Sequence, residues 1–410
     1  MLNKLLKIFW GAFLFIFPFS LTFVVYEEFS YRFGNFNPYV TGFIYLPEIL
    51  LGTVFILWLI DKFRISDFRF RISKNWLWIL LLLFLINASV VTVINGDYIL
   101  LGFFLLRIFE AIIIYLFTTT ELLPIKTVVQ ILLGGAAFQL ILGWFQWRLN
   151  HSVGLKILGE QVISSETYNV AKTDIEGIKQ IRPYGTFLHP NILAAYLMSV
   201  MLISIPYLKK FNLLFWLIVL TGGVYFTKST AAGLITLVAF GLMILFSFLK
   251  DQKTKKGISL ILLVILLLVN AWFFQNSEKV NFSDSSWQER LSQNIVSREM
   301  FDSNVLGVGI GDFTWEMENY ASEKLAPWEF QPVHNVYYLV LNELGIQGLL
   351  LLLIAIITIT YYYWKQGSII PLFALILIAP FDHFLWDSYV GLILVAIVFG
   401  FFSLQNSHNE

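Results

Sequence analysis

Apolar segments of about 20 residues, the length that crosses roughly 30 Å of hydrocarbon as a helix, follow one another along this chain. We expect twelve of these segments to span a membrane. They are residues 8–25, 40–60, 76–94, 98–117, 126–147, 185–207, 211–227, 230–249, 258–274, 335–363, 369–382 and 386–404. The short segment 369–382 contains Pro371 and Pro380, so we expect it to be tilted or broken. The pattern predicts an all-α membrane protein with about twelve transmembrane helices.

The polar residues are too few to cover the surface of a soluble protein. Hydrophobic residues make up 58% of the 410 residues and charged residues 13%, whereas a globular protein carries roughly 25% charged residues. The 27 basic residues balance 27 acidic ones, so no nucleic-acid partner is expected. The absence of cysteine removes disulfides and thiolate catalysis. The start of the chain is interpreted as the first span, because its apolar run is long for a signal peptide and further spans follow at once.

The charges of the loops predict the orientation in the membrane. With a cytoplasmic N-terminus, the short inner loops and termini carry 15 Lys and Arg residues, against Arg32 and Lys228 in the short outer loops. We therefore expect both termini to be cytoplasmic and two longer polar segments, 148–184 and 275–334, to be external. Residues 1–410 are expected to form one membrane domain, in which 275–334 is a partly helical extracytoplasmic loop between spans nine and ten. Loops of this length favour a functional role.

A first candidate site lies where the sixth span begins, in the run R-P-Y-G-T-F-L-H-P-N at 182–191. Pro190 disfavours helix at His189, so the helix is expected to start near Asn191 with its free N–H groups and positive dipole end facing outward. Together with Arg182, this helix end suits an anionic group such as a diphosphate. The alternative is that His189 and Asn191 only cap the helix while Arg182 meets lipid phosphate.

A second candidate site lies where the loop 275–334 enters the tenth span, at His334, Asn335 and Tyr338. A histidine at this boundary can take a proton from an attacking hydroxyl. The alternative is an interfacial histidine that is hydrogen-bonded to a carbonyl. Glu343 lies about 13 Å deeper along the helix, so it is poorly placed to orient His334. We expect Glu343 to make a buried hydrogen bond that fixes helix packing.

The loop 275–334 also carries two arginines and a run of glycines. Arg290 and Arg298 are eight residues apart, which places them on similar faces of a helix, where they bind phosphate or merely solvate the helix. The run G-V-G-I-G at 307–311 follows no βαβ unit and has no P-loop lysine, so a nucleotide loop is rejected. We expect the glycines to let the backbone pass close to a neighbour or ligand.

Charged residues in two other spans give weaker signals. Arg107 and Glu110 lie three residues apart in the fourth span and are expected to form a structural pair. Asp382, His383 and Asp387 lie at the outer turn between the last two spans. A metal site at this turn is an alternative, but further clustered ligands are lacking, and no metal is expected.

Taken together, the motifs resemble those of the O-antigen ligase/O-antigen polymerase family of bacterial membrane glycosyltransferases. They are R-P-x-G-T-F-x-H-P-N at 182–191, L-G-V-G-x-G-x-F at 306–313, and H-N-x-Y-x-x-x-L-x-E-L-G-x-x-G at 334–348. The resemblance covers roughly residues 180–350. The flanking spans are similar to the family only in number and hydrophobicity.

The resemblance implies a polyprenyl-diphosphate-linked glycan as donor, which is transferred to an acceptor hydroxyl at an extracytoplasmic site in the bacterial inner membrane. His334 resembles the catalytic histidine of the family, and Arg182 resembles a diphosphate-binding arginine. The sequence departs from the family pattern at the turn 227–230, where Thr230 stands in place of an arginine. Lys228 supplies a charge two residues away, but a lysine cannot make the same bidentate contact.

The residues and the resemblance together predict an inverting, metal-independent glycosyltransferase without a cofactor, in which His334 is the general base. The diphosphate is expected to bind Arg182, Lys228, Arg290 and Arg298. Supporting roles are expected for His189, Asn191, Asn335, Tyr338, Glu343, Asp382 and His383. The acceptor is a glycan, a lipid core or a protein, so an O-antigen ligase, a polymerase and a protein O-oligosaccharyltransferase all stay open. A lipid-linked glycan flippase without chemistry is the alternative from another class.

Overall fold

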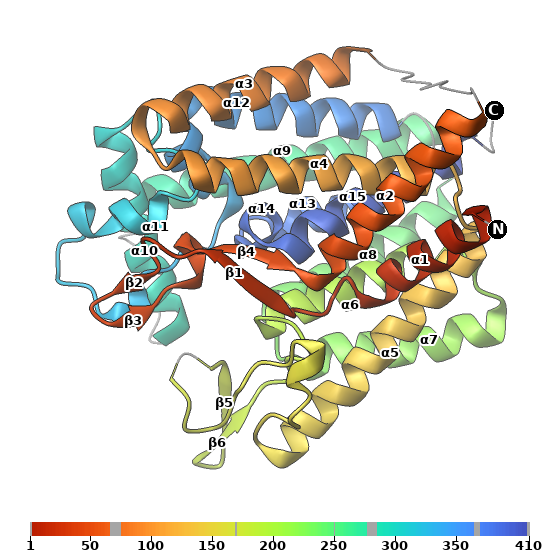
Figure 1. Cartoon of the computed structure of the whole chain (residues 1–410), viewed down its shortest axis with the longest axis horizontal. Coiled ribbons are helices and arrows are strands. Elements are labelled where there is room, and N and C mark those ends of the chain that lie inside the picture. Colours follow the sequence, from red (N-terminus) through yellow and green to blue (C-terminus); the bar gives the residue numbers. More distant parts are fainter. Residues whose placement is uncertain are drawn as a thin grey trace.

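The computed structural model describes residues 2–65, 75–168, 170–249, 251–276, 285–364 and 370–407. Most of these residues are helical. The helices are α1 (Leu2–Ile16), α2 (Leu46–Ile65), α3 (Asn75–Asn95), α4 (Tyr98–Thr119), α5 (Ile125–Leu149), α6 (Pro190–Ser204), α7 (Lys210–Phe226), α8 (Thr230–Phe248), α9 (Gln252–Asn276), α10 (Ser285–Ser303), α11 (Phe313–Glu316), α12 (Val336–Trp364), α13 (Ile370–Ile378), α14 (Phe384–Asp387) and α15 (Tyr389–Ser407). In Figure 1, α1 begins at the right-hand end, while α10, α11 and the strands gather at the left.

Six helical segments within the described residues are long and apolar enough to cross a membrane. They are Trp76–Asn95, Tyr98–Thr119, Ile125–Leu149, Pro190–Tyr207, Thr230–Phe248 and Val336–Tyr361. Each of the twelve expected segments overlaps a helix, but the expected number of spans is twice the number that meets these criteria. Helix lengths and composition indicate a multi-pass membrane protein. The count of twelve spans stays a prediction.

The expectation of a helical fold is confirmed in its main part, but the described residues also include three two-stranded antiparallel sheets that were not expected. The strands are β1 (Thr22–Tyr26), β2 (Tyr31–Arg32), β3 (Asn35–Phe36), β4 (Gly42–Tyr45), β5 (Lys172–Ile175) and β6 (Ile178–Ile181). They pair as β1 with β4, β2 with β3 and β5 with β6. In Figure 1, β1 and β4 lie left of the centre, β2 and β3 lie near α10, and β5 and β6 lie at the lower left.

The pairing of β1 with β4 corrects the expected limits of the first two spans. Pro18 cannot donate a backbone hydrogen bond and disfavours helix before it, and α1 ends at Ile16. The β-branched and aromatic run T-F-V-V-Y at 22–26 then forms β1 in place of the last turn of a helix. Its partner β4 occupies 42–45, so the second helix begins at Leu46 and not near residue 40.

The segment 369–382 is broken, as its two prolines predict. Helix α13 ends at Ile378, and the chain turns through Pro380 before the short helix α14. This turn carries Asp382 and His383. Its position is fixed by a backbone hydrogen bond of 2.9 Å from Val336 N–H, at the start of α12, to the carbonyl of Ala379.

The centre of the core is α6, which has a single partly exposed residue, Asn191. This helix packs against α5, α7, α8, α13 and α15. The first residues of α6 therefore lie where several helices meet, and side chains there contact segments that are remote in sequence.

The two long polar segments hold structure of their own. The segment 148–184 contains the hairpin β5–β6, beneath which Ile163, Ile181 and Tyr184 form a small separate core. The segment 275–334 contains α10, which packs against α12 and supplies the helical part of the expected loop. Residues 277–284 lie outside the described residues. The placement of both segments outside a membrane stays a prediction.

Candidate functional site

The start of α6 is held by side chains of the motif at 182–191. His189 has an extended backbone (φ −152°, ψ 146°), and its Nδ1 accepts a hydrogen bond of 3.2 Å from the N–H of Asn191. It is therefore the N-cap, and the helix begins at Pro190, one residue before the expected start. The capping alternative is correct for His189, but Asn191 does more than cap.

The amide of Asn191 connects a guanidinium to a carboxylate. Its Oδ1 accepts a hydrogen bond of 2.8 Å from Arg182 Nη2, and its Nδ2 donates one of 2.9 Å to Asp382 Oδ2. Because an amide both donates and accepts, it joins the two charged groups without a direct ion pair. Asp382 is 191 positions away along the chain.

Arg182 also reaches the turn between α7 and α8. Its Nε donates a hydrogen bond of 2.7 Å to the carbonyl of Thr227. This turn is the one in which Thr230 replaces the arginine of the family pattern. The structure therefore brings the two segments that the resemblance links to diphosphate binding next to each other.

The backbone of the motif at 182–191 is clamped by a buried glutamine of α5. Gln146 Oε1 accepts hydrogen bonds from the N–H groups of Tyr184 (3.1 Å) and Gly185 (2.8 Å). Gly185 has φ +62°, and a Cβ there would lie 2.4 Å from Gln139 Oε1. Only glycine fits this turn without strain or a clash.

His334 enters the same region from the start of α12. Asn335 caps α12, since its Oδ1 accepts hydrogen bonds from the N–H groups of Tyr337 (2.9 Å) and Tyr338 (3.3 Å). The imidazole of His334 packs edge-on against that of His383, with ring centres 5.2 Å apart. The capping of α12 thus orients the residue immediately before it.

We call the side chains of Arg182, His189, Asn191, His334, Asp382 and His383 the histidine–aspartate cluster. Asp382 and His383 are buried, whereas the other four members are half-buried. They come from the start of α6, the start of α12 and the turn before α14, so three segments remote in sequence converge. The sequence presents the motifs of Arg182 and His334 as two separate candidate sites. The structure places both side chains near one buried carboxylate, that of Asp382.

The pKa values of the two buried members of the cluster are shifted in opposite directions. Burial alone would raise the pKa of Asp382, but the neighbouring imidazoles, above all His383, and the hydrogen bond from Asn191 lower this pKa below its usual value. Burial lowers the pKa of His383, but Asp387, 2.7 Å from its Nδ1, outweighs burial and raises this pKa. The raised pKa favours the protonated form of His383, and the lowered pKa favours the carboxylate form of Asp382.

The half-buried histidines stay neutral. Burial, reinforced by the charge of His383, lowers the pKa of His334 to about 3. Burial lowers the pKa of His189 to about 4, against the opposite effect of Asp382. The charge of Arg290 on α10 lowers both pKa values further. The imidazole of His334 is therefore neutral across the physiological pH range and keeps its lone pair.

Gln293 on α10 is a contact of the cluster that the sequence analysis missed. Its Oε1 lies 2.7 Å from His334 Nδ1, and its side chain is 3% exposed. An amide oxygen only accepts, so Nδ1 carries the hydrogen and Nε2 carries the lone pair. The one signal in the sequence is that Gln293 follows Arg290 by three residues, on the same face of a helix.

The four cations predicted to bind diphosphate are in different places. Arg182 belongs to the cluster, and Arg290 is near enough to act on its histidines. Arg298 is 4.0 Å from Asp302 and partly exposed, about 12 Å along α10 from Arg290. Lys228 is exposed, with φ +57° and its Nζ 4.6 Å from the ring centre of Tyr225.

Glu343 makes the buried hydrogen bonds that its place in the tenth span predicts. Its Oε1 accepts one of 2.9 Å from the N–H of Gly311, and its Oε2 accepts one of 2.7 Å from the indole N–H of Trp386. These bonds tie α12 to the glycine run and to α14. We call Glu343, Gly307, Gly311, Gly345 and Trp386 the Glu343 junction.

The glycine run passes against the backbone of α12, as expected. Gly307 (φ +98°) lies against the backbone at 343–345, and Gly345 (φ +72°) lies against the backbone at 305–306. A Cβ on Gly307 would lie 2.6 Å from the carbonyl oxygen of Glu343, and one on Gly345 would lie 2.5 Å from Leu306. The N–H of Gly309 donates a hydrogen bond of 2.9 Å to that same carbonyl. The prediction of a close backbone approach to a neighbour is confirmed.

The two weaker signals have separate outcomes. Arg107 lies 3.5 Å from Glu110 and also pairs with Glu48, so the structural pair is confirmed. At Asp382, His383 and Asp387, as elsewhere among the described residues, there is no group of three or more His, Cys, Asp or Glu side chains that could hold a metal ion. Asp382 is instead hydrogen-bonded to Asn191.

A comparison with known protein families agrees with the motifs. The model of the O-antigen ligase family matches residues 213–353, from α7 into α12. This region holds Lys228, Arg290, Gln293 and His334, and the match confirms the resemblance. Arg182 and Asp382 lie outside it and are joined to it by the contacts above. No curated protein matches the chain.

Proposed function

We propose that this chain, which the match at 213–353 assigns to the O-antigen ligase family, transfers a glycan from a polyprenyl diphosphate to an acceptor hydroxyl. The observation that carries the proposal is the link from Arg182 through Asn191 to Asp382, beside which His334 lies. A cation for the leaving group and a neutral base for the nucleophile are thereby brought to one place. The reaction needs both groups at once.

His334 is proposed as the general base. Its Nε2 takes the proton of the acceptor hydroxyl as the oxygen attacks the anomeric carbon from the side opposite the diphosphate. The new carbon–oxygen bond forms, the bond to the diphosphate oxygen breaks with its electron pair, and the configuration inverts. The carboxylate of Asp382 then stabilises the imidazolium that results.

Arg182 is proposed to bind the diphosphate. Two of its five N–H donors are used by Asn191 and Thr227, and no described residue accepts from Nη1. These donors and the positive charge of Arg290 stabilise the negative charge that develops on the leaving group. Lys228 and Arg298 are proposed to contact the diphosphate only if their side chains turn from Tyr225 and Asp302.

The remaining predictions belong to the same proposal. His189, Asn191, Asn335, Tyr338, Asp382 and His383 support the site, and Glu343 supports its fold. The reaction takes place on the extracytoplasmic face of the bacterial inner membrane, both termini are cytoplasmic, and neither a metal nor a cofactor takes part. The acceptor is a lipid core, a growing glycan or a protein hydroxyl.

The test is glycan transfer by the purified protein with a lipid-linked oligosaccharide and an acceptor. We expect His334→Ala to lower the transfer rate roughly 10²–10⁴-fold, the usual contribution of a general base, with an unchanged melting temperature. His151→Ala is the matched control, because His151 is an exposed loop histidine whose Nδ1 contacts only a neighbouring carbonyl. Normal transfer by His334→Ala would refute the role of this residue. A wild-type protein that moves the donor across vesicles without forming a glycosidic bond would favour the flippase alternative.

A further inference from the structure

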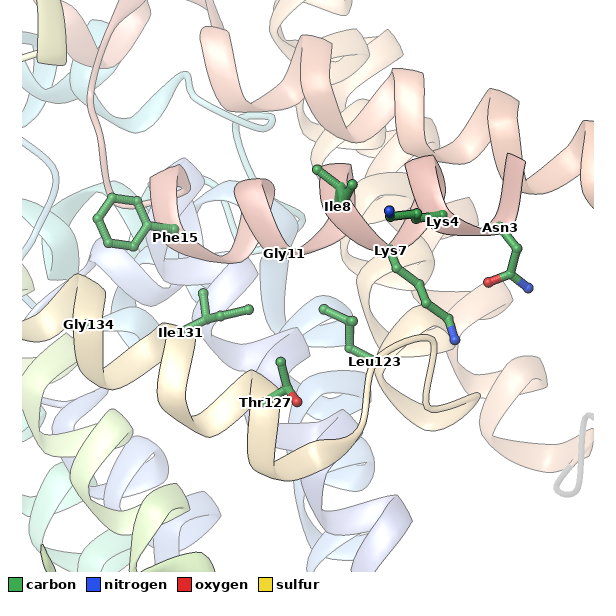
Figure 2. A pocket seen from close by; sticks show the side chains of 10 residues that line it. All are labelled: Asn3, Lys4, Lys7, Ile8, Gly11, Phe15, Leu123, Thr127, Ile131 and Gly134. Atoms are coloured by element: carbon green, nitrogen blue, oxygen red, sulfur yellow. The ribbon is translucent and has the colours of Figure 1, made fainter. Parts of the chain in front are cut away.

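A groove between α1 and α5 is not used by the proposed reaction. Its cavity volume is about 630 Å³, and none of the histidine–aspartate cluster lines it. Figure 2 shows it running between the two helices. The residues that line it are Asn3, Lys4, Lys7, Ile8, Gly11, Phe15, Leu123, Thr127, Ile131 and Gly134.

The length of the groove is apolar and is kept open by two glycines. Ile8 and Phe15 line it from α1, and Ile131 lines it from α5. A Cβ on Gly11 would meet Ile131 at 3.3 Å, and one on Gly134 would meet only Phe15, at 3.9 Å. Small residues here leave room for a thin hydrocarbon between the helices.

One end of the groove is positively charged. Lys4 and Lys7 are exposed, and Figure 2 shows Lys7 extending from α1 toward Leu123. Helices α1 and α5 both begin at this end, so their positive dipole ends add to the charge. Helix α5 has no side-chain cap, and no acidic residue in the described part of the chain lines the groove.

We propose that this groove binds an anionic phospholipid, with one acyl chain between α1 and α5 and its phosphate at Lys4 and Lys7. Helix α5 is long and apolar enough to span a membrane. The side of α5 that lines the groove would therefore face the hydrocarbon of the bilayer. An apolar channel that ends in two lysines complements an acyl chain that ends in an anion. The groove lies toward the start of α1, away from α10 and its residues Arg290 and Gln293 (Figure 1). The lipid bound here is therefore distinct from the glycan donor.

The proposal is tested with the full-length protein by native mass spectrometry. Phosphatidylglycerol and phosphatidylcholine with identical acyl chains are added in turn, and the bound fraction is titrated. We expect wild type to prefer phosphatidylglycerol, and Lys4→Gln with Lys7→Gln to lose about fivefold in that preference for each lysine. Lys209→Gln with Lys210→Gln is the matched control, since it removes two exposed lysines elsewhere and should leave the preference unchanged.

A second variant separates the head group from the acyl chain. Gly134→Leu places a side chain in the groove and should weaken the binding of both phospholipids by the same factor. Equal binding of the two lipids by wild type would overturn the proposal, as would an unchanged preference in the double lysine variant. Displacement of phosphatidylglycerol by an equimolar polyprenyl phosphate would also overturn it, because the groove would then be a donor site. Glycan transfer is not the readout, so the proposed reaction can fail without affecting this result.

Discussion

The histidine–aspartate cluster and the Glu343 junction each contain a buried carboxylate, and α14 or the turn before it contacts both. The oxygens of Glu343 accept hydrogen bonds from a backbone N–H and an indole, and neither donor titrates. Asp382 is surrounded by imidazoles and lies one amide away from a guanidinium. A carboxylate among fixed donors holds segments together, whereas a carboxylate among titratable groups controls where protons reside. We therefore expect substitutions in the cluster to change activity and those in the junction to change stability.

Beside the effect expected at His334, a large difference between the two regions is expected at Arg182. Arg182→Ala removes the cation proposed for the diphosphate and should lower transfer roughly 10²–10³-fold, the usual cost of one transition-state donor. Arg182→Lys should recover only part of the rate, because lysine cannot make the bidentate contact. Transfer rates and binding of the lipid-linked donor are measured together. Unchanged donor binding by Arg182→Ala would argue against its role.

The junction should respond to loss of its carboxylate by unfolding more easily. Glu343→Leu leaves the N–H of Gly311 and the indole N–H of Trp386 without acceptors. We expect the free energy of unfolding to fall by about 2–4 kcal/mol, or about 1–2 kcal/mol for each unsatisfied donor. Thermal unfolding in detergent measures it. A folded Glu343→Leu protein with wild-type stability but no transfer would place Glu343 in the reaction and break the comparison.

The close backbone contact at Gly345 in the junction should have a smaller effect on stability, which arises only from backbone conformation and packing. Gly345→Ala requires φ +72° of an alanine and places its Cβ 2.5 Å from Leu306. We expect the free energy of unfolding of Gly345→Ala to be roughly 1–3 kcal/mol lower than that of wild type. Gly233→Ala in α8 is the control, because its Cβ meets nothing within 4 Å, and a helical alanine should be neutral or stabilising. Similar melting temperatures for both variants would contradict the close packing.

The finest test of the cluster is the pH profile of a Gln293 variant. In wild type the pKa of His334 is lowered to about 3, so its protonation should not reduce transfer between pH 8 and 5. Gln293→Glu places a carboxylate beside Nδ1 of His334, which favours the imidazolium. The pKa of His334 should therefore rise by roughly 1–3 pH units. The loss of activity on acidification should then begin at higher pH. Gln293→Leu should lower the rate without that shift, and identical profiles for all three proteins would exclude positioning by Gln293.

Much of the local structure followed from the sequence. The apolar lengths placed a helix in each expected segment, Pro190 placed the start of α6 to within one residue, and the glycines at 307–311 indicated close backbone contact. The strand β1 was not expected, because an apolar run of five residues suits a helix or a strand equally well. Its partner β4 settled the choice, and such pairing depends on a remote segment.

By itself the sequence determined that this chain is helical and apolar, that His334 and Asn191 stand at the entrances of helices, and that Glu343 needs partners. These properties depend on neighbours within a turn or two and on the cost of burying polar groups. Only the tertiary structure decided that Arg182 and Asp382 share one amide, and that Gln293 faces His334. Such contacts arise from how α6, α10, α12 and α13 pack together. Packing is set by the shapes of whole helices, which no single motif encodes.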